Sequence, residues 1–413
     1  MPMSPRPADP RRADQRPAVR PLEVERVTHP ERGVVLRDRL GLSEPTFVPE
    51  ALLPIVGRCT GEYTLTQIRQ AAARQLGEDV PLEFVTGLVQ QLDDRLLLLG
   101  ERFDAALATA AADFLARGVR PASHAGSAGC PSEPAALRRA LAAMVPGPAG
   151  PTTTLRGLVA PHIDLQRGAD GYRAAYTRLL AAPPADLYVV FGTGHAGPQA
   201  PVTGLPLDWQ TPLGTVATDR AFVDAVHAVL GPPQPMDLLI HRDEHSLEFQ
   251  MLFLQHLHER RGGGQPFRVA GFLCGALPSA SGNPLDEAWV QRLLGAFRAA
   301  EQQSGRRICY VAGADLAHIG PFFGDDAAVD DARLVQLASA EHERLRWLQE
   351  GAPGAFHAAV DCAHNPDRVC SAPAITLCAA LAGGVGELLH YGQARADDGS
   401  QTVSFCAMAF GGA

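Results

Sequence analysis

The sequence has no excess of positive charge and no long apolar run. Its 36 lysine and arginine residues are outnumbered by 45 aspartate and glutamate residues, so the formal net charge is -9 at pH 7. Nucleic-acid binding depends on a positive field, so we expect no nucleic-acid partner. No apolar stretch approaches the roughly 18 residues of a membrane-spanning helix, and the N-terminus lacks a hydrophobic signal core. We therefore expect a cytoplasmic protein with no membrane partner.

Closely paired cysteines are also missing. The eight cysteines of the 413-residue chain form no CxxC pair and no dense framework, which is typical of reduced thiols rather than of disulfides. Hydrophobic residues make up 46% of the chain, which is enough for an ample core. A chain of this length predicts one large domain and a smaller one.

Changes in composition divide the chain into four segments. Residues 1–20 are rich in proline and arginine and predict a disordered tail, because they cannot bury apolar surface. Residues 21–117 predict a compact helical domain. Residues 118–153 are rich in proline, glycine and alanine and predict a connecting segment with one helix inside it. Residues 154–413 alternate between strand-like and helix-like stretches, which predicts an α/β domain.

The small domain is predicted from helical periodicity. Apolar residues recur at helical spacing in residues 61–77, where Thr64 can cap the helix and Gln67 occupies the capping-box position. Residues 50–59 are also helix-like, and residues 79–100 predict a helix followed by a short apolar strand. This order of elements is typical of a winged-helix-like unit.

In this pattern of elements, residues 33–103 resemble the small PqqD-like, peptide-binding winged-helix modules. The resemblance implies a domain that binds a peptide or recruits a partner protein. An accessory domain that only packs on its neighbour is the alternative. DNA binding is disfavoured, because the second helix carries only Arg69 and Arg74 as cations.

The large domain is predicted from six apolar segments that alternate with helix-like ones. The expected strands are LRGLVA (155–160), DLYVVFG (186–192), FRVAGFLC (267–274), RICYVAGA (307–314), ELLHYGQA (387–394) and VSFCAMAF (403–410). The expected helices cover residues 171–180, 219–229, 246–259, 285–303, 328–349 and 373–381. Strands that alternate with helices predict a doubly wound α/β/α sandwich.

Three of these strands end in a turn that carries histidine. His162 follows the first strand, His195 follows the second, and Asp315 and His318 follow the fourth. In an open α/β sheet, the loops at the carboxyl ends of the strands line the ligand crevice. These side chains therefore predict a metal site or an acid/base site.

One cysteine is predicted to join this set. Cys370 precedes a helix with Pro373 in its first turn, so the positive end of the helix dipole favours the thiolate. A thiolate and two neutral imidazoles suit iron, copper or zinc. The remaining cysteines lack such a setting and are assigned to packing: Cys59, Cys130, Cys274, Cys309, Cys362, Cys378 and Cys406.

One glycine-rich motif has to be weighed against the metal site. GTGHAG (192–197) matches the dinucleotide-binding pattern GxGxxG and directly follows a strand. That pattern requires a helix whose N-terminus holds the pyrophosphate. Pro198 and Pro201 follow at once, so no such helix can start there, which disfavours a dinucleotide site.

A second motif, HRDEH (241–245), matches the HxxEH pattern of inverted zinc proteases. In that pattern both histidines and the glutamate face one metal from a helix. Helical apolar spacing begins only at Leu247, so the motif lies at or before a helix N-terminus. We expect Glu244, His245 and Glu248 to orient the metal ligands or to act as acid/base groups.

Six ordered motifs resemble those of the MEMO family, also called AmmeMemoRadiSam system protein B. They are APHIDLQRGADGYRAAY, FGTGHAG, DWQTPLGTVATD, DEHSLEFQMLFLQ, GADLAHIG and VCSAPAITL, and the resemblance covers residues 122–412. SHAGSAGCPSEPAALRRAL resembles the segment that opens the domain of this family. The family is similar in fold to the class III extradiol dioxygenases, which implies an α/β/α sandwich with a central mixed sheet.

The resemblance implies a metal site made of His162, His195 and Cys370. Iron is the first expectation, with copper or zinc as alternatives, because the related dioxygenases hold a non-haem iron. Asp164 stands where the family's PHAG form has a small residue, and a single His195 stands where some members have two histidines. These departures bear on the fine tuning of the site rather than on its existence.

The function implied by the resemblance is a cytoplasmic, metal-dependent redox enzyme in a modification pathway. His245, His318, Asp315 and Glu244 would then move protons or orient the metal ligands. A radical-SAM protein and an AMMECR-type protein are the expected partners, and a peptide or small molecule is the expected substrate. The alternative is a non-catalytic adaptor, in which the MEMO-like cleft binds a peptide and the N-terminal domain recruits a partner.

Overall fold

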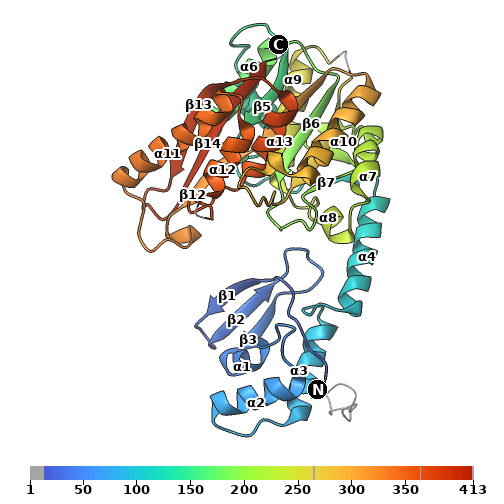
Figure 1. The fold of residues 1–413 in the computed structure, drawn as a ribbon, viewed down its shortest axis with the longest axis vertical. Helices are drawn as coiled ribbons and strands as arrows, with labels where there is room; N and C mark the ends of the chain where they lie inside the picture. The colour runs from blue at the N-terminus through green and yellow to red at the C-terminus, as the bar shows by residue number, and fades with distance from the viewer. Residues whose placement is uncertain (1–13, 264–265, 363, 412–413) are drawn as a thin grey trace. The chain divides into compact units, whose positions relative to one another are not determined.

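The computed structural model describes residues 14–263, 266–362 and 364–411. The chain divides into two compact units, Met1–Asp113 and Phe114–Ala413, and both units contain helices and strands (Figure 1). None of the described helices combines the length and the apolar composition that crossing a bilayer requires.

The N-terminal unit contains a small antiparallel sheet that the sequence analysis does not predict. Its strands pair in the order β1 (Glu23–Val27), β2 (Gly33–Arg37) and β3 (Thr46–Pro49). Val34 and Leu36 of β2 are buried and join the core of the unit. The residues of β1 are largely exposed, so no alternation of apolar and polar residues marks this strand in the sequence.

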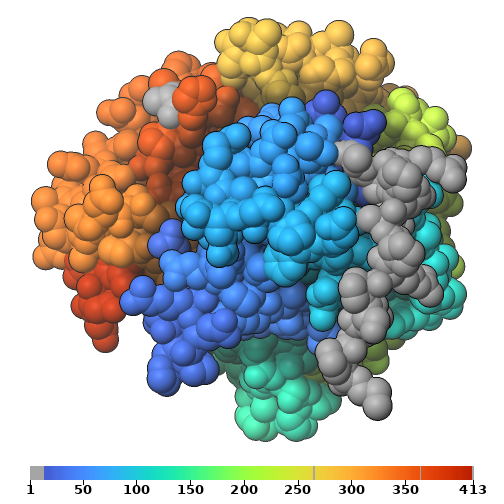
Figure 2. Space-filling model, turned by 90° about the horizontal axis from the view of Figure 1, so that it is seen from below, coloured from blue at the N-terminus to red at the C-terminus, as the bar shows by residue number. Residues whose placement is uncertain are grey.

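Helices complete the N-terminal unit. They are the short η2 (Glu50–Leu52) and α1 (Leu53–Val56), followed by α2 (Leu65–Leu76), α3 (Leu82–Asp94) and α4 (Glu101–Ala116), whose last residues, 114–116, belong to the C-terminal unit. The predicted capping box is confirmed, because Thr64 and Gln67 each accept a hydrogen bond from the backbone of the other at the start of α2. Leu65, Ile68 and Ala72 form the buried face of α2. In Figure 2 the segments of this unit, coloured in shades of blue, adjoin in one continuous body.

The start of the chain differs from the predicted tail. Residues 1–13 of that tail lie outside the described residues. Val19 forms an isolated bridge with Leu98, and buried Arg20 forms a 2.6 Å ion pair with Asp38. The N-terminal unit therefore includes chain before residue 21. The short apolar strand expected after α3 is reduced to the single bridge at Leu98.

An eight-stranded mixed sheet forms the centre of the C-terminal unit. Its strands are β5 (Leu155–Ala160), β6 (Leu187–Thr193), β7 (Val202–Gly204), β10 (Arg268–Cys274), β11 (Ile308–Gly313), β12 (Asp315–Ile319), β13 (Gly386–Arg395) and β14 (Thr402–Gly411). Their order is β12-β14-β5-β11-β6-β10-β7, and β13 pairs with β14. β5, β11, β6 and β10 run parallel, whereas the other pairs are antiparallel. All six predicted strands are confirmed, while β7 and β12 are additional.

Helices cover both faces of this sheet. They are α5 (Pro134–Met144), α6 (Ala169–Ala181), α7 (Arg220–Leu230), α9 (His245–Arg260), α10 (Ala288–Ser304), α11 (Asp331–Gln349), α12 (Pro353–Asp361) and α13 (Ala372–Ala382). Phe191 of β6 packs on Phe297 of α10 with ring centroids 5.2 Å apart, whereas a Cβ atom at Gly192 would meet Ser246 of α9. Successive strand residues point to opposite faces, so α10 and α9 cover opposite faces. The predicted α/β fold is confirmed, with a large central mixed sheet.

Short elements fill the connections of the C-terminal unit. They are β4 (Val119–Arg120), β8 (Asp208–Thr211) and β9 (Gly214–Val216), which form a small second sheet, with α8 (Pro235–Leu239), η3 (Pro284–Asp286) and η4 (Pro321–Phe323). The GTGHAG motif after β6 leads into turns rather than into a helix, as predicted. The helix that a bound pyrophosphate would need is therefore missing from this described segment.

Candidate metal centre

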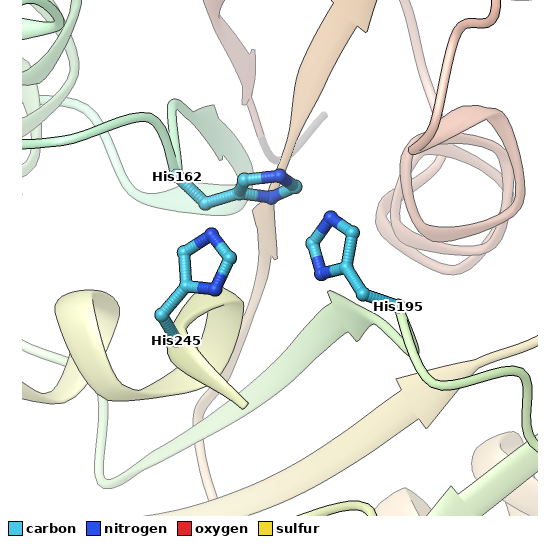
Figure 3. A group of neighbouring side chains, drawn as sticks. All are labelled: His162, His195 and His245. Carbon is cyan, nitrogen blue, oxygen red and sulfur yellow. The ribbon is translucent and has the colours of Figure 1, made fainter. Parts of the chain in front are cut away.

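Three histidine side chains converge at the carboxyl ends of the parallel strands (Figure 3). His162 lies two residues after β5, His195 lies two residues after β6, and His245 is the first residue of α9. One ring nitrogen of each lies within 4.8 Å of the other two. The ring centroid of His195 lies 5.0 Å from the centroid of each of the other two rings, and the ring centroids of His162 and His245 are 5.3 Å apart. Imidazoles placed in this way can share one metal ion.

The His162 ring is fixed by the neighbouring parallel strand. Its Nδ1–H group donates to the carbonyl oxygen of Gly313 at 2.9 Å, and its backbone N–H donates to Oδ1 of Asp315 at 2.9 Å. The side chain is buried. Because Nδ1 is engaged by this carbonyl, Nε2 is the nitrogen that can bind a metal, which is the arrangement that metal-binding histidines adopt.

His195 is held by Glu244 at the start of α9. Nδ1 of His195 lies 3.0 and 3.1 Å from the two carboxylate oxygens, and its backbone N–H donates to the same group at 3.0 Å. Glu244 also caps α9 by accepting from the N–H of Ser246. Burial opposes the charged form of His195, but its hydrogen bonds with Cys370 and Glu244 outweigh burial and raise its pKa to about 10. A metal that binds His195 must therefore displace a proton.

His245 joins the cluster, although the sequence predicts it only as an acid/base or orienting group. Its ring stacks on that of His195 with 12° between the ring planes. Burial, together with repulsion from His162, lowers the pKa of His245 to about 3. The ring is therefore neutral at pH 7 and carries a lone pair that a metal can use. This geometry makes His245 a candidate for a third imidazole donor.

Cys370 places sulfur beside the imidazoles, just before α13. Its Sγ lies 3.7 Å from Nε2 of His162 and 3.2 Å from Oγ of Ser371. Burial opposes the thiolate, but His162 and His195 outweigh burial and lower the pKa of Cys370 to about 6. The thiolate is the form of cysteine that binds metals. Cys370 is therefore a candidate donor alongside the three histidines.

Asp315 contacts the cluster, whereas His318 lies further along β12. Oδ2 of Asp315 is 3.5 Å from Nε2 of His162, and burial raises the pKa of Asp315 to about 6. A carboxyl group with that pKa can take up and release a proton near neutral pH. His318 is not one of the three clustered histidines. Its Nδ1–H donates to the carbonyl of Leu316 at 3.1 Å, and its ring packs edge-on against Phe323.

The predicted metal ion fits the donors that the fold brings together. Imidazole and thiolate are ligands that iron, copper and zinc share. The carbonyl of Gly313 accepts a hydrogen bond from Nδ1 of His162, and Glu244 accepts one from Nδ1 of His195. Metal-bound histidines commonly donate the N–H of their second ring nitrogen in this way. The predicted ligands His162 and His195 thus lie together, and His245 extends the set.

A buried ion pair supports the site from a segment that the sequence analysis does not connect with it. Arg120 of β4 pairs with Glu248 of α9, and both side chains have at most 1% exposure. The backbone N–H groups of Ser123 and His124 donate to the same carboxylate at 3.1 to 3.2 Å. The ring of His124 consequently lies 5.2 Å from that of His245. In the sequence, the position of His124 within the SHAGSAGC motif is the feature that could have indicated its place near the site.

Two residues from the sequence analysis lie elsewhere. His241, the first histidine of the HxxEH pattern, is buried beside Trp209 and is not part of the histidine cluster. The arrangement of an inverted zinc protease is therefore not formed. Cys362 was assigned to packing but is exposed, which corrects that assignment. The other six cysteines assigned to packing are buried.

Comparison with known proteins gives matches over the C-terminal unit. A family model described as "Memo-like protein" matches residues 120–409. A MEMO1 family protein of Aquifex aeolicus is 30% identical over 223 residues, which cover 54% of this chain and 59% of that protein. One of Methanococcoides burtonii is 34% identical over 165 residues, covering 40% and 55%. One of Thermus thermophilus is 28% identical over 321 residues, covering 74% and 86%.

The matched parts span little more than half the length of the first two relatives, whereas the family model covers most of this chain. The histidine cluster, Cys370 and the Arg120–Glu248 pair all lie within the residues that the model matches. The chain therefore belongs to the MEMO family.

Proposed function

We propose that the protein is a metal-dependent redox enzyme of a modification pathway, acting as the B component of an AmmeMemoRadiSam system. The observation that supports this proposal is the convergence of three imidazoles and the Cys370 thiol at one point. A bound iron or copper ion would supply electron-transfer or oxygen chemistry there. Iron is the proposed metal, by the similarity of the family's fold to the class III extradiol dioxygenases.

The chain's own groups would position the donors and handle protons. Glu244 keeps the Nδ1 proton of His195, so the Nε2 proton is the one that leaves when a metal binds. Asp315 lies 3.5 Å from Nε2 of His162 and is placed to exchange a proton with a ligand bound at the cluster. His318 interacts electrostatically with Asp315 and is the proposed second proton-handling group.

The N-terminal unit would serve the same pathway as a PqqD-like winged-helix module. Its proposed task is to bind a peptide, which the resemblance of residues 33–103 supports. A radical-SAM protein and an AMMECR-type protein are the proposed partners, and the cytoplasm is the proposed location. The substrate is then a peptide or a small molecule presented to the metal.

The test is metal analysis of the full-length protein purified without oxygen. We expect stoichiometric iron and a thiolate-to-metal absorption band that Cys370→Ser abolishes, because serine gives no such band. Exposed Cys362 supplies the matched control, and Cys362→Ser should keep both the metal and the band. Oxygen uptake that starts only when a substrate is added would identify turnover. A protein that holds zinc alone, or no metal, would contradict the redox proposal and favour the non-catalytic adaptor.

A further inference from the structure

A cavity lies in the C-terminal unit, and none of the clustered histidines lines it. Its volume is about 410 Å³, which is within the range of roughly 300 to 1,000 Å³ typical of small-molecule sites. The walls come from residues 199–202, from α7 and the residues that follow it, from α8 and from α10. The residues that matter for the chemistry are His227, Asp237, Trp289 and Arg292.

The carboxylate of Asp237 is only half satisfied. Oδ1 accepts from the backbone N–H of Gln199 at 2.7 Å and from that of Ala200 at 3.4 Å. Oδ2 has no hydrogen-bond partner among the described residues, although the side chain is fully buried and lines the cavity. A buried acceptor without a partner is unfavourable, so a donor that enters the cavity would be stabilised there.

The rest of the wall suits an apolar body. Trp289 is half-buried and packs on the main core, Leu293 is buried, and Pro232 and Pro233 lie at the same cavity. An aromatic wall also attracts a cation electrostatically. The cavity therefore combines an indole surface with the unpartnered Oδ2 of Asp237.

The other polar groups of the wall do not occupy that acceptor. Nε2 of His227 accepts from the backbone N–H of Gly204 at 3.2 Å, and burial lowers the pKa of His227, so its ring is neutral. Arg292 is exposed, and its guanidinium forms no hydrogen bond with Oδ2 of Asp237 in the described structure. No side chain of the described wall therefore satisfies Oδ2 of Asp237.

We propose that this cavity binds a small molecule with an apolar body and a protonated amine or amidine head, which donates a hydrogen bond to Oδ2 of Asp237. The apolar body packs on Trp289. A carboxylate or phosphate ligand is disfavoured at this position, because its oxygen atoms would face the acceptor of Asp237. This site is separate from the metal centre, so its test does not depend on the redox proposal.

The experiment titrates the full-length protein with benzylamine and with benzyl alcohol, which has a similar shape but no charge. Calorimetry should show saturable benzylamine binding about tenfold or more tighter than that of the alcohol, because hydrogen bonds between charged groups are the stronger ones. Equal binding of the two probes would overturn the proposal, as would the absence of saturable benzylamine binding.

Substitutions then assign the binding to Asp237. Asp237→Asn can keep the acceptor that holds Gln199 but puts an amide in place of Oδ2, so benzylamine binding should weaken about tenfold or more. Asp224→Asn is the matched control, because it removes the same charge from an exposed position of α7. Unchanged binding in Asp237→Asn, or equal weakening in both variants, would overturn the proposal.

Trp289→Leu provides a second route in case Asp237→Asn does not fold. It should weaken both probes together, since it removes the aromatic wall but not the carboxylate. Trp347→Leu is the control, because Trp347 is 37% exposed and lies outside the cavity. Full benzylamine affinity in Trp289→Leu would place the probe elsewhere and would overturn the assignment to this cavity.

Discussion

A buried arginine–carboxylate pair occurs in each unit, and the two pairs differ in what they hold. Arg20 and Asp38 have side-chain exposures of 2% and 1%, and Arg120 and Glu248 have 0% and 1%. Backbone N–H groups also donate hydrogen bonds to both carboxylates. The first pair joins the start of the described chain to a loop of the small domain. The second joins the segment with His124 to the helix that begins with His245. The first ion pair therefore stabilises only its own domain, whereas the second also positions residues beside the candidate metal donors.

The largest effect is expected from breaking either pair. Arg20→Met and Arg120→Met each leave a buried carboxylate without its cation, which destabilises a protein by about 3 to 5 kcal/mol. Denaturant unfolding measures this loss for the two variants. Only Arg120→Met should also weaken metal binding, because Glu248 and His124 lie beside His245. Equal metal loss in Arg20→Met would show that the comparison between the pairs is wrong.

Removing a donor should act on the C-terminal unit without unfolding it. His162→Ala and His195→Ala should each weaken metal binding by more than the factor of about 10 to 100 that an outer residue causes. Far-UV circular dichroism should stay native, because a core of this size does not need a metal to fold. Cys362→Ser is the control, with metal content measured for all variants. Near-wild-type metal in His162→Ala or His195→Ala would contradict the cluster.

Two further variants decide how the donor set is completed. His245→Gln and Cys370→Ser are compared under the same conditions, because both side chains reach the cluster. If both lose metal as strongly as His195→Ala, the site has four protein donors. If His245→Gln keeps the metal, His245 is an acid/base group as the sequence alone predicts.

The sequence predicts the strand-end donors because they depend on local pattern. A continuous apolar run followed by a Pro- or Gly-rich turn places His162 and His195 at the carboxyl ends of β5 and β6. Cys370 is likewise predicted from its place before a helix with a proline in its first turn. These signals are short-range, so tertiary packing does not change them.

The contacts that the sequence does not predict depend on long-range packing. His245 enters the cluster because the first turn of α9 packs on Gly192 of β6, which places the His245 ring 5.3 Å from that of His162. The position of His124 depends on Arg120, which is 128 residues from its partner Glu248. In the N-terminal unit, β1 was missed because its residues are exposed and carry no apolar alternation. Period and composition cannot report contacts of this range.

The pH dependence of metal binding tests whether His195 and Cys370 are ligands. The pKa of His195 is raised to about 10, and the pKa of Cys370 is lowered to about 6. Between these values a metal must displace one proton, from His195, so its affinity should rise about tenfold for each unit of pH. Below pH 6 a second proton, on Cys370, makes the dependence steeper. Chelator competition from pH 5 to 9 measures the slope, and a flat profile would contradict His195 as a ligand.

The smallest effect is expected in the N-terminal unit, at the cap of α2. Thr64→Ala removes the side chain that accepts from the N–H of Gln67, which costs about 1 kcal/mol. Thr109→Ala makes the same chemical change at an exposed position inside α4 and should be neutral or slightly stabilising, since alanine favours helix. Proteolysis of the N-terminal unit should therefore speed up only in Thr64→Ala, while the metal affinity of both variants stays at the wild-type value. A change of metal affinity in Thr64→Ala would mean that the N-terminal unit influences the donor cluster. The two units would then no longer differ in whether they support the metal donors.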